Sequence, residues 1–82
     1  MIVETRFFSS NIAGKLRDGA YELPEGSTVT RLMDAAFDEA MLDFPADQRI
    51  NFVFVYDNSP ASPETVLSDG GKLRVLFKIT GG

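Results

Sequence analysis

The last eleven residues, Lys72-Leu-Arg-Val-Leu-Phe-Lys-Ile-Thr-Gly-Gly82, alternate in polarity and end in two glycines. Apolar side chains occupy every second position from Leu73 to Ile79, and cations alternate with most of them. This period of two predicts a strand with one buried face. Because glycine has no Cβ, we expect residues 80–82 to form a thin, flexible tail. Such a tail fits a narrow channel, in which another enzyme can activate the carboxylate of Gly82.

Size and composition indicate one small domain over residues 1–82. The chain is 44% hydrophobic and contains seven phenylalanines, enough for one core without a disulfide or metal. It has neither cysteine nor histidine. Disulfides, thiolate or imidazole metal sites, and nucleophiles that depend on Cys or His are therefore excluded for this chain acting alone. Most enzyme chemistry is excluded with them.

The charge distribution argues against a nucleic-acid surface, because the net charge is −4 and the eight cations are scattered. An acidic domain suits a partner with a basic face, but a solvated surface without a partner explains the composition equally well. The first residues lead into an apolar strand that contains Glu4 and Arg6, unlike a signal peptide. No stretch reaches the roughly 18 apolar residues of a membrane span. We therefore expect a cytoplasmic protein.

The amino-terminal part predicts two strands. Residues 2–9 are β-branched and aromatic, which predicts a first strand with positions 3, 5 and 7 inward. Residues 10–19 are polar and predict a loop in which Ile12 and Leu16 fold back as apolar plugs. Residues 20–23 then predict a short second strand, antiparallel to the first.

One amphipathic helix follows. Thr28, or with less support Ser27, can accept a hydrogen bond from the first turn and is the expected N-cap. Apolar residues recur with helical spacing from Val29 to Phe44, which predicts one continuous stripe. Pro45 disfavours a helical conformation in the residue before it, so the helix is expected to end near Phe44. We interpret its acidic residues as a solvated face rather than a metal site.

Residues 50–56 give the strongest strand pattern, and they are apolar on both faces. Either the valines, Val53 and Val55, or the aromatic residues must point away from the helix, because one helix covers only one side of a sheet. An uncovered aromatic set beside Arg74, Leu76 and Lys78 would form a docking surface with a basic rim. Coverage of this set by loops is the equally weighted alternative.

Turn-forming residues dominate the connection to the last strand. Residues 57–63 predict a turn, residues 64–67 a short edge strand, and residues 68–71 a tight turn. Because no helix follows Asp69-Gly-Gly71 and the spacing of a P-loop is absent, these glycines predict a turn rather than a phosphate-binding loop.

Three motifs carry a resemblance to a known family: Leu23-Pro-Glu-Gly-Ser-Thr-Val29, Leu67-Ser-Asp-Gly-Gly71 and Thr80-Gly-Gly82. Together with the order strand, strand, helix, strand, short strand, strand, they resemble the MoaD/ThiS-type sulfur-carrier family of ubiquitin-like β-grasp proteins. The resemblance spans essentially the whole chain. In two places the chain departs from the family pattern. Gly71 replaces the usual aspartate of the turn, and Phe77-Lys78 stands where molybdopterin-type members often carry two prolines.

The resemblance implies an α+β fold with a mixed sheet of four to five strands and one main helix across one face. The first and last strands are expected to lie parallel in the centre of the sheet. Leu76 would then lie on the exposed face, where relatives dock their activating enzyme. The residues expected to contact a partner are Arg74, Leu76, Phe77, Lys78 and Thr80.

The resemblance also implies a chemical cycle for Gly82, with Gly81 as the flexible part of the tail. An E1-like enzyme of the MoeB/ThiF type adenylates the carboxylate with ATP and magnesium. A sulfur donor converts the acyl-adenylate to a thiocarboxylate, which supplies sulfur in cofactor biosynthesis of the molybdopterin or thiamin-thiazole type. A larger synthase subunit is a further expected partner. The chain would be a cosubstrate rather than an enzyme and would bind no cofactor itself.

Two alternatives remain open from the sequence. The same activated Gly82 can be joined to a lysine of another protein, which would make the chain a ubiquitin-like protein modifier. Alternatively the terminus is inert, and the chain is a ubiquitin-like interaction module that works through the face bearing Leu76.

Overall fold

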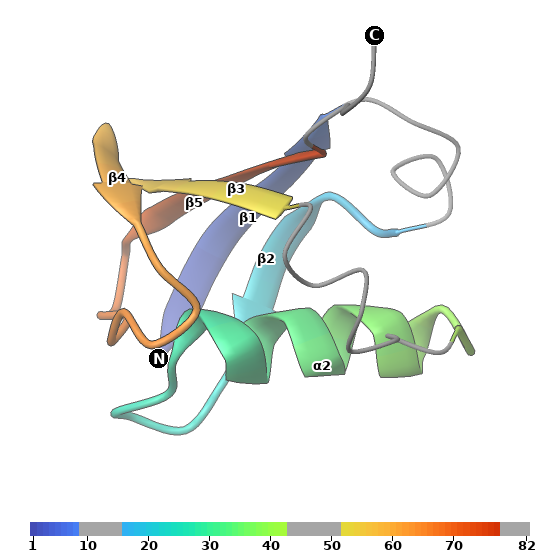
Figure 1. Ribbon diagram of the computed structural model, residues 1–82. Coiled ribbons are helices and arrows are strands. Elements are labelled where there is room, and N and C mark those ends of the chain that lie inside the picture. The colour runs from blue at the N-terminus through green and yellow to red at the C-terminus, as the bar shows by residue number, and fades with distance from the viewer. Residues whose placement is uncertain (9–15, 43–51, 78–82) are drawn as a thin grey trace, which may run out of the picture.

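The computed structural model describes residues 1–8, 16–42 and 52–77 (Figure 1). Within them, five strands form one sheet in the order β2-β1-β5-β3-β4, and helix α2 lies against one side of it. β1 and β5 are parallel, and the other neighbouring strands are antiparallel. The predicted α+β fold with a mixed sheet and a central parallel pair is therefore confirmed. The elements are β1 (Ile2–Phe8), β2 (Gly19–Glu22), α2 (Val29–Glu39), β3 (Phe52–Tyr56), β4 (Ser59–Ala61) and β5 (Lys72–Phe77).

The two faces of β1 separate as the alternation predicts. Val3, Thr5 and Phe7 are buried, and the even-numbered side chains of the strand are exposed. Because a side chain in a strand points to the opposite face from its neighbours, this pattern sends one set into the core and the other to the far face of the sheet.

β2 lies one residue earlier than the predicted range 20–23 and pairs antiparallel with β1, as expected. Its following residue, Leu23, is buried and donates its backbone N–H to the carbonyl oxygen of Met1 at 2.9 Å, which extends the contact between the two segments. Leu16 is buried and confirms the predicted plug. Ile12 lies outside the described residues.

Helix α2 begins as predicted, with Thr28 as its N-cap. The Thr28 Oγ1 accepts from the backbone N–H of Arg31 at 3.4 Å. Burial of the apolar face against the sheet holds the helix, because amphipathic helices owe most of their stability to such packing. The buried residues of this face are Val29, Leu32, Met33, Ala36 and Phe37.

The predicted extension of the helix to Phe44 is wrong, because α2 ends at Glu39 and Ala40 is the C-cap. Met41 has a φ of 58° and is 93% exposed, so it does not belong to the buried stripe. Residues 43–51, which include Pro45, lie outside the described residues.

Two hydrogen bonds explain the early end of the helix. The N–H of Met41 donates to the carbonyl oxygen of Asp38 at 3.0 Å, and the N–H of Leu42 donates to that of Phe37 at 2.9 Å. This pair of bonds around a left-handed residue is the Schellman motif, which satisfies carbonyl groups that the ended helix leaves open. Leu42 packs against the core in the turn that follows. Apolar spacing alone does not reveal this helix end. Met41 is apolar and continues the helical spacing, but its backbone has the left-handed conformation that ends a helix.

The edge strand also differs from the prediction. It is β4, within the segment predicted as a turn, whereas residues 64–67 contribute only an isolated bridge between Val66 and Thr28. Asp57 and Asn58, with φ of 50° and 66°, form a two-residue hairpin turn between β3 and β4. Two consecutive left-handed residues are typical of a type I′ turn, whose twist matches the strands it joins. Pro60 is compatible with β4, because an edge strand can leave one N–H position unpaired.

The open question about residues 50–56 has a clear outcome in the described part, Phe52–Tyr56. Phe54 is 4% exposed and lies in the core, and Phe52 and Tyr56 pack against the core from the same side of the strand. The valines point away from the helix, with Val53 44% exposed. The aromatic side chains therefore face the helix and pack in or against the core, whereas the valines face away from it.

The turn predicted over 68–71 is confirmed. It leads into β5 and is hydrogen-bonded to the start of β1. Gly70 has a φ of 81°, a conformation that favours glycine. Its N–H donates to the carbonyl oxygen of Ile2 at 2.8 Å, and the Asp69 Oδ1 accepts from the N–H of Ile2 at 2.7 Å.

Gly71, the departure from the family pattern in this turn, has a steric reason in this chain. A Cβ at Gly71 would overlap the phenol ring of Tyr56. The Tyr56 hydroxyl accepts from the backbone N–H of Ser68 at 2.7 Å and lies 2.9 Å from the Ser68 Oγ. Glycine at 71 therefore makes room for a tyrosine that closes the turn.

Candidate functional site

β5 is the central strand of the described sheet, with β1 on one side and β3 on the other. Of the residues predicted to contact a partner, the structure places Arg74 and Leu76 on the face opposite the helix, both exposed. The backbone of Phe77 pairs with Phe52. Lys78, Thr80, Gly81 and Gly82 lie outside the described residues, so their predicted roles stay predictions.

Leu76 belongs to a row of three apolar side chains on this open face. Phe8 of β1 and Val53 of β3 are both Cα partners of Leu76 in the sheet register. Phe8 and Leu76 are each 38% exposed, and Val53 is 44% exposed. We call Phe8, Leu76 and Val53 the apolar row. It crosses the three central strands beside the last described residue of β5.

A second row lies next to it, two residues back along β1 and β5 and two residues on along the antiparallel β3. Arg6 and Arg74 are Cα partners in the parallel pair, and Val55 is the partner of Arg74 on the other side. Both arginines are exposed. We call Arg6 and Arg74 the arginine pair. The two residues, together with Glu4, Lys72 and the backbone neighbour Leu73, line a cavity of about 390 Å³ on this part of the sheet.

Sequence reasoning named Arg74 and Leu76 for this face but did not place Phe8, Val53 and Arg6 beside them. The alternation within each strand already indicates which of its residues share a face. The register between strands decides which of them become neighbours, and a single sequence does not contain it.

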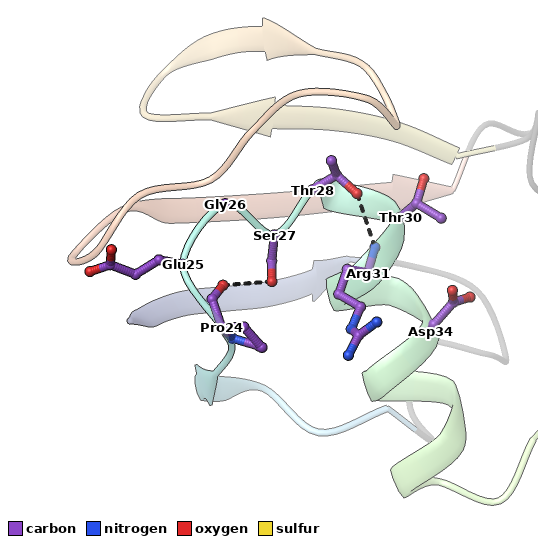
Figure 2. Close-up of a pocket in the computed structure, with 8 residues that line it drawn as sticks. All are labelled: Pro24, Glu25, Gly26, Ser27, Thr28, Thr30, Arg31 and Asp34. Atoms are coloured by element: carbon purple, nitrogen blue, oxygen red, sulfur yellow. Dashed lines mark hydrogen bonds between the residues drawn. The ribbon is translucent and has the colours of Figure 1, made fainter.

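Another hollow, of about 460 Å³, lies at the amino end of α2 (Figure 2). The first helical N–H groups there already have acceptors within the protein. The N–H of Val29 donates to the carbonyl oxygen of Thr65 at 3.0 Å, and the N–H of Thr30 to that of Pro63 at 3.0 Å. Figure 2 shows the bond from the Arg31 N–H to Thr28 and a second one from the Ser27 hydroxyl to Pro24. The backbone N–H groups of Val29, Thr30 and Arg31 are therefore not free to bind an anion.

A cluster around Tyr21 supports the fold away from the open face. The Arg17 guanidinium lies 4.2 Å from the centre of the Tyr21 ring and donates from Nε to the Glu39 carboxylate at 2.9 Å. The Tyr21 hydroxyl donates to the carbonyl oxygen of Arg17 at 2.6 Å. Burial raises the pKa of Tyr21 above its usual value, because the phenolate would lose its hydration.

Neither a metal site nor a membrane helix was found among the residues that the structure describes. In those ranges, no three Asp or Glu side chains gather where they could hold a metal ion. The described helix is too short to cross a membrane.

Comparison with known proteins gave matches only among solved structures, since neither a protein family nor a curated protein matches the sequence. The chain resembles small archaeal modifier protein 1 of Haloferax volcanii in two crystal structures. One has a TM-score of 0.77 at 18% identity and covers 100% of both chains. The other has a TM-score of 0.76 at 16% identity and covers 95% of this chain and 98% of that one.

A third similar structure is a chain from the complex of subunits 1 and 2 of the molybdopterin-converting factor from Helicobacter pylori 26695. Its TM-score is 0.56 at 18% identity, with 100% of both chains covered. At these identities the similarity concerns the fold. One helix packed on a mixed five-stranded sheet with parallel first and last strands is the arrangement that the resemblance implied. The chain therefore has a ubiquitin-like β-grasp fold, which it shares with these solved structures.

Proposed function

We propose that this chain is a sulfur carrier whose reactive group is the carboxylate of Gly82. In the first step an oxygen of this carboxylate attacks the α-phosphorus of ATP on an E1-like enzyme of the MoeB/ThiF type, and magnesium pyrophosphate leaves. In the second step a sulfide-level sulfur attacks the acyl carbon, and AMP leaves. The resulting thiocarboxylate donates its sulfur in cofactor biosynthesis of the molybdopterin or thiamin-thiazole type, in the cytoplasm.

The position of β5 is the observation that carries this proposal. Hydrogen bonds to neighbours on both sides hold β5, and the chain runs from it directly into the sequence Lys78-Ile-Thr-Gly-Gly82. A strand held in this way makes the domain a rigid handle for a reactive end. The apolar row lies beside the last described residue of β5 and offers an activating enzyme a docking surface.

The chain itself contributes no catalyst to this cycle, because it has neither Cys nor His. A carboxylate becomes a useful electrophile only when one oxygen is converted to a leaving group, and the partner enzyme and ATP supply that step. In this proposal Gly81 keeps side-chain bulk away from the reacting carbon, and Leu76 and Arg74 contact the partner. Phe77, Lys78 and Thr80 are proposed further contacts on the way to the active site.

The neighbours in fold agree with a carrier that works through other proteins. One is a chain of a two-subunit complex of molybdopterin-converting factor, which supports a larger synthase subunit as a further proposed partner. The other is an archaeal modifier, which supports the main alternative, conjugation of Gly82 to a lysine of another protein.

The mass of the intact protein from its native cells tests the proposal. We expect a species in which sulfur replaces one oxygen of the Gly82 carboxylate, mapped to the carboxyl-terminal peptide and lost on oxidation. If the protein stays unmodified even after incubation with native lysate, ATP, magnesium and sulfide, the carrier proposal fails.

Two further observations separate the alternatives. A protein modifier leaves adducts in which Gly82 is linked to a lysine of another protein, whereas a carrier cycles as free protein. An interaction module keeps its function when Gly81 and Gly82 are deleted and loses partner binding with Leu76→Asp. For a sulfur carrier, the deletion alone abolishes function.

A further inference from the structure

The arginine pair places like charges side by side at the centre of the sheet. Arg6 and Arg74 are directly paired in the parallel ladder between β1 and β5, and both point to the open face. Like charges on paired positions of neighbouring strands destabilise a sheet, since the two side chains share one small region of surface. Folding alone therefore gives no reason for this pairing.

No ion pair within the described residues holds either arginine of the pair. In the described part of the chain neither guanidinium has an ion-pair partner, although Glu4 lies next to Arg6 on the same face of β1. The ion pair between Arg17 and Glu39 forms elsewhere, at the carboxyl end of α2. The fork of donors on each arginine is thus available to an acceptor from outside, and a guanidinium fork suits a carboxylate.

The surroundings of the arginine pair indicate which other groups a partner surface would present. The apolar row, formed by Phe8, Leu76 and Val53, lies next to the pair, two residues further along β1 and β5. The described strands place three cations (Arg6, Lys72 and Arg74) and two carboxylates (Glu4 and Glu22) on the open face, whereas the whole chain has a net charge of −4. A partner that fits both rows presents carboxylates next to apolar side chains.

We propose that the arginine pair binds carboxylates on the activating enzyme, next to apolar side chains of that enzyme that cover the apolar row. This inference rests on the proposed function and adds the chemistry of the partner surface. The pair selects an acid-bearing partner surface, while the apolar row supplies buried area. Complementary charges of this kind speed and orient docking more than they tighten it, and they act at the rim of the apolar contact.

Other occupants fit the face less well. A nucleic acid or an anionic membrane presents continuous phosphate charge, which Glu4 and Glu22 on the same face would repel. A second copy of the chain would have to place its own acidic residues on the arginines. A charged surface of that copy would then lie over the apolar row.

The test is thiocarboxylation of Gly82 in cleared native lysate with ATP, magnesium and sulfide, measured by intact mass at a series of chain concentrations. Arg6→Glu and Arg74→Glu are compared with Arg31→Glu, which makes the same charge change on the exposed helix. We expect each variant of the pair to raise the half-saturating concentration about tenfold, and Arg31→Glu to change it by less than about threefold. The difference should shrink as salt rises from about 0.05 M to about 0.5 M, because exposed charges are screened.

Each remaining outcome overturns the inference, the proposed function or both, or supports the inference. If the wild-type chain is thiocarboxylated and the three variants saturate alike, the inference is wrong and the proposed function stands. If the wild-type chain is never thiocarboxylated, both fail.

Wild-type binding to duplex DNA or to vesicles with anionic lipid, lost in Arg74→Glu, would replace the protein partner by a phosphate ligand. A wild-type dimer in light scattering that Arg74→Glu dissociates would replace it by a second copy. Melting temperatures of the Arg6→Gln and Arg74→Gln variants, expected at or above that of the wild type, show that the pair is not a structural requirement.

Discussion

Substitution of Gly71 by alanine tests how the turn before β5 is built. The backbone of Gly71 does not have the positive φ that excludes alanine, so the obstacle is contact rather than conformation. An added Cβ would lie 2.6 Å from the Cζ of Tyr56, far inside van der Waals contact. The tyrosine must therefore move, and its hydroxyl then loses its bonds to Ser68.

The magnitude follows from these two effects. Each hydrogen bond of the hydroxyl contributes about 0.5 to 1.5 kcal/mol net, with the lower end appropriate to a partly solvated group, and overpacking typically costs about 1 to 3 kcal/mol. Replacing glycine by alanine also reduces the conformational freedom of the unfolded chain, which stabilises the folded state by about 0.4 to 1 kcal/mol. We expect Gly71→Ala to lower the free energy of unfolding by about 1 to 2.5 kcal/mol, out of roughly 4 to 12 kcal/mol for a domain of this size.

The decisive measurement is a double-mutant cycle with Tyr56→Ala, followed by urea unfolding and circular dichroism. Without the ring, Gly71→Ala should be neutral or slightly stabilising, which gives a coupling energy of about 2 kcal/mol. Gly70→Ala is the matched control. Gly70 has a positive φ but open space around it, so its replacement should cost about 1 kcal/mol with or without Tyr56. A coupling below about 0.5 kcal/mol for Gly71, or an equal coupling for Gly70, would refute the steric explanation.

Three further predictions concern the helix end, the tyrosine cluster and the tail. Met41→Gly should raise the free energy of unfolding by about 0.5 to 1 kcal/mol, because glycine adopts the left-handed conformation without strain, and Met41→Ala should not; equal effects of the two would contradict the cap. Burial holds the pKa of Tyr21 above its unfolded value, so the folded state keeps the proton longer and stability should fall as the pH rises through about 10. Tyr21→Phe should reduce this fall in alkaline urea titrations, and an unchanged slope would argue against the assignment. Gly81→Val should lower the rate of Gly82 thiocarboxylation with little change in melting temperature, and a large thermal loss would show that the tail has a structural role.

Patterns within single segments predicted much of this molecule. The alternation of β1 correctly assigned Val3, Thr5 and Phe7 to the core, and Thr28 was correctly predicted as the helix cap. The resemblance of three short motifs and the element order to β-grasp proteins anticipated the parallel β1–β5 pair. These features are local, or are carried by the order of the elements, and a sequence displays both.

The errors arose where backbone conformation and polarity disagree. Met41 continues the apolar spacing, yet its left-handed backbone ends the helix. The segment that contains Pro60 looks like a turn, yet the two-residue turn at Asp57 and Asn58 leaves it free to pair at the sheet edge. Hydrophobic periodicity reports which side chains are buried, and it does not report φ.

By itself the sequence narrowed the classes of chemistry open to this protein, because a chain without cysteine or histidine has no thiolate or imidazole group to use. Where polar and apolar residues alternate, as in β1, it also determined which face each residue of the strand occupies. Only the tertiary structure decided which residues of different strands meet, because register depends on hydrogen bonds between segments that are distant in the chain. That register joined Phe8 and Val53 to Leu76, and Arg6 to Arg74, and so created the surface on which the proposed partner docks.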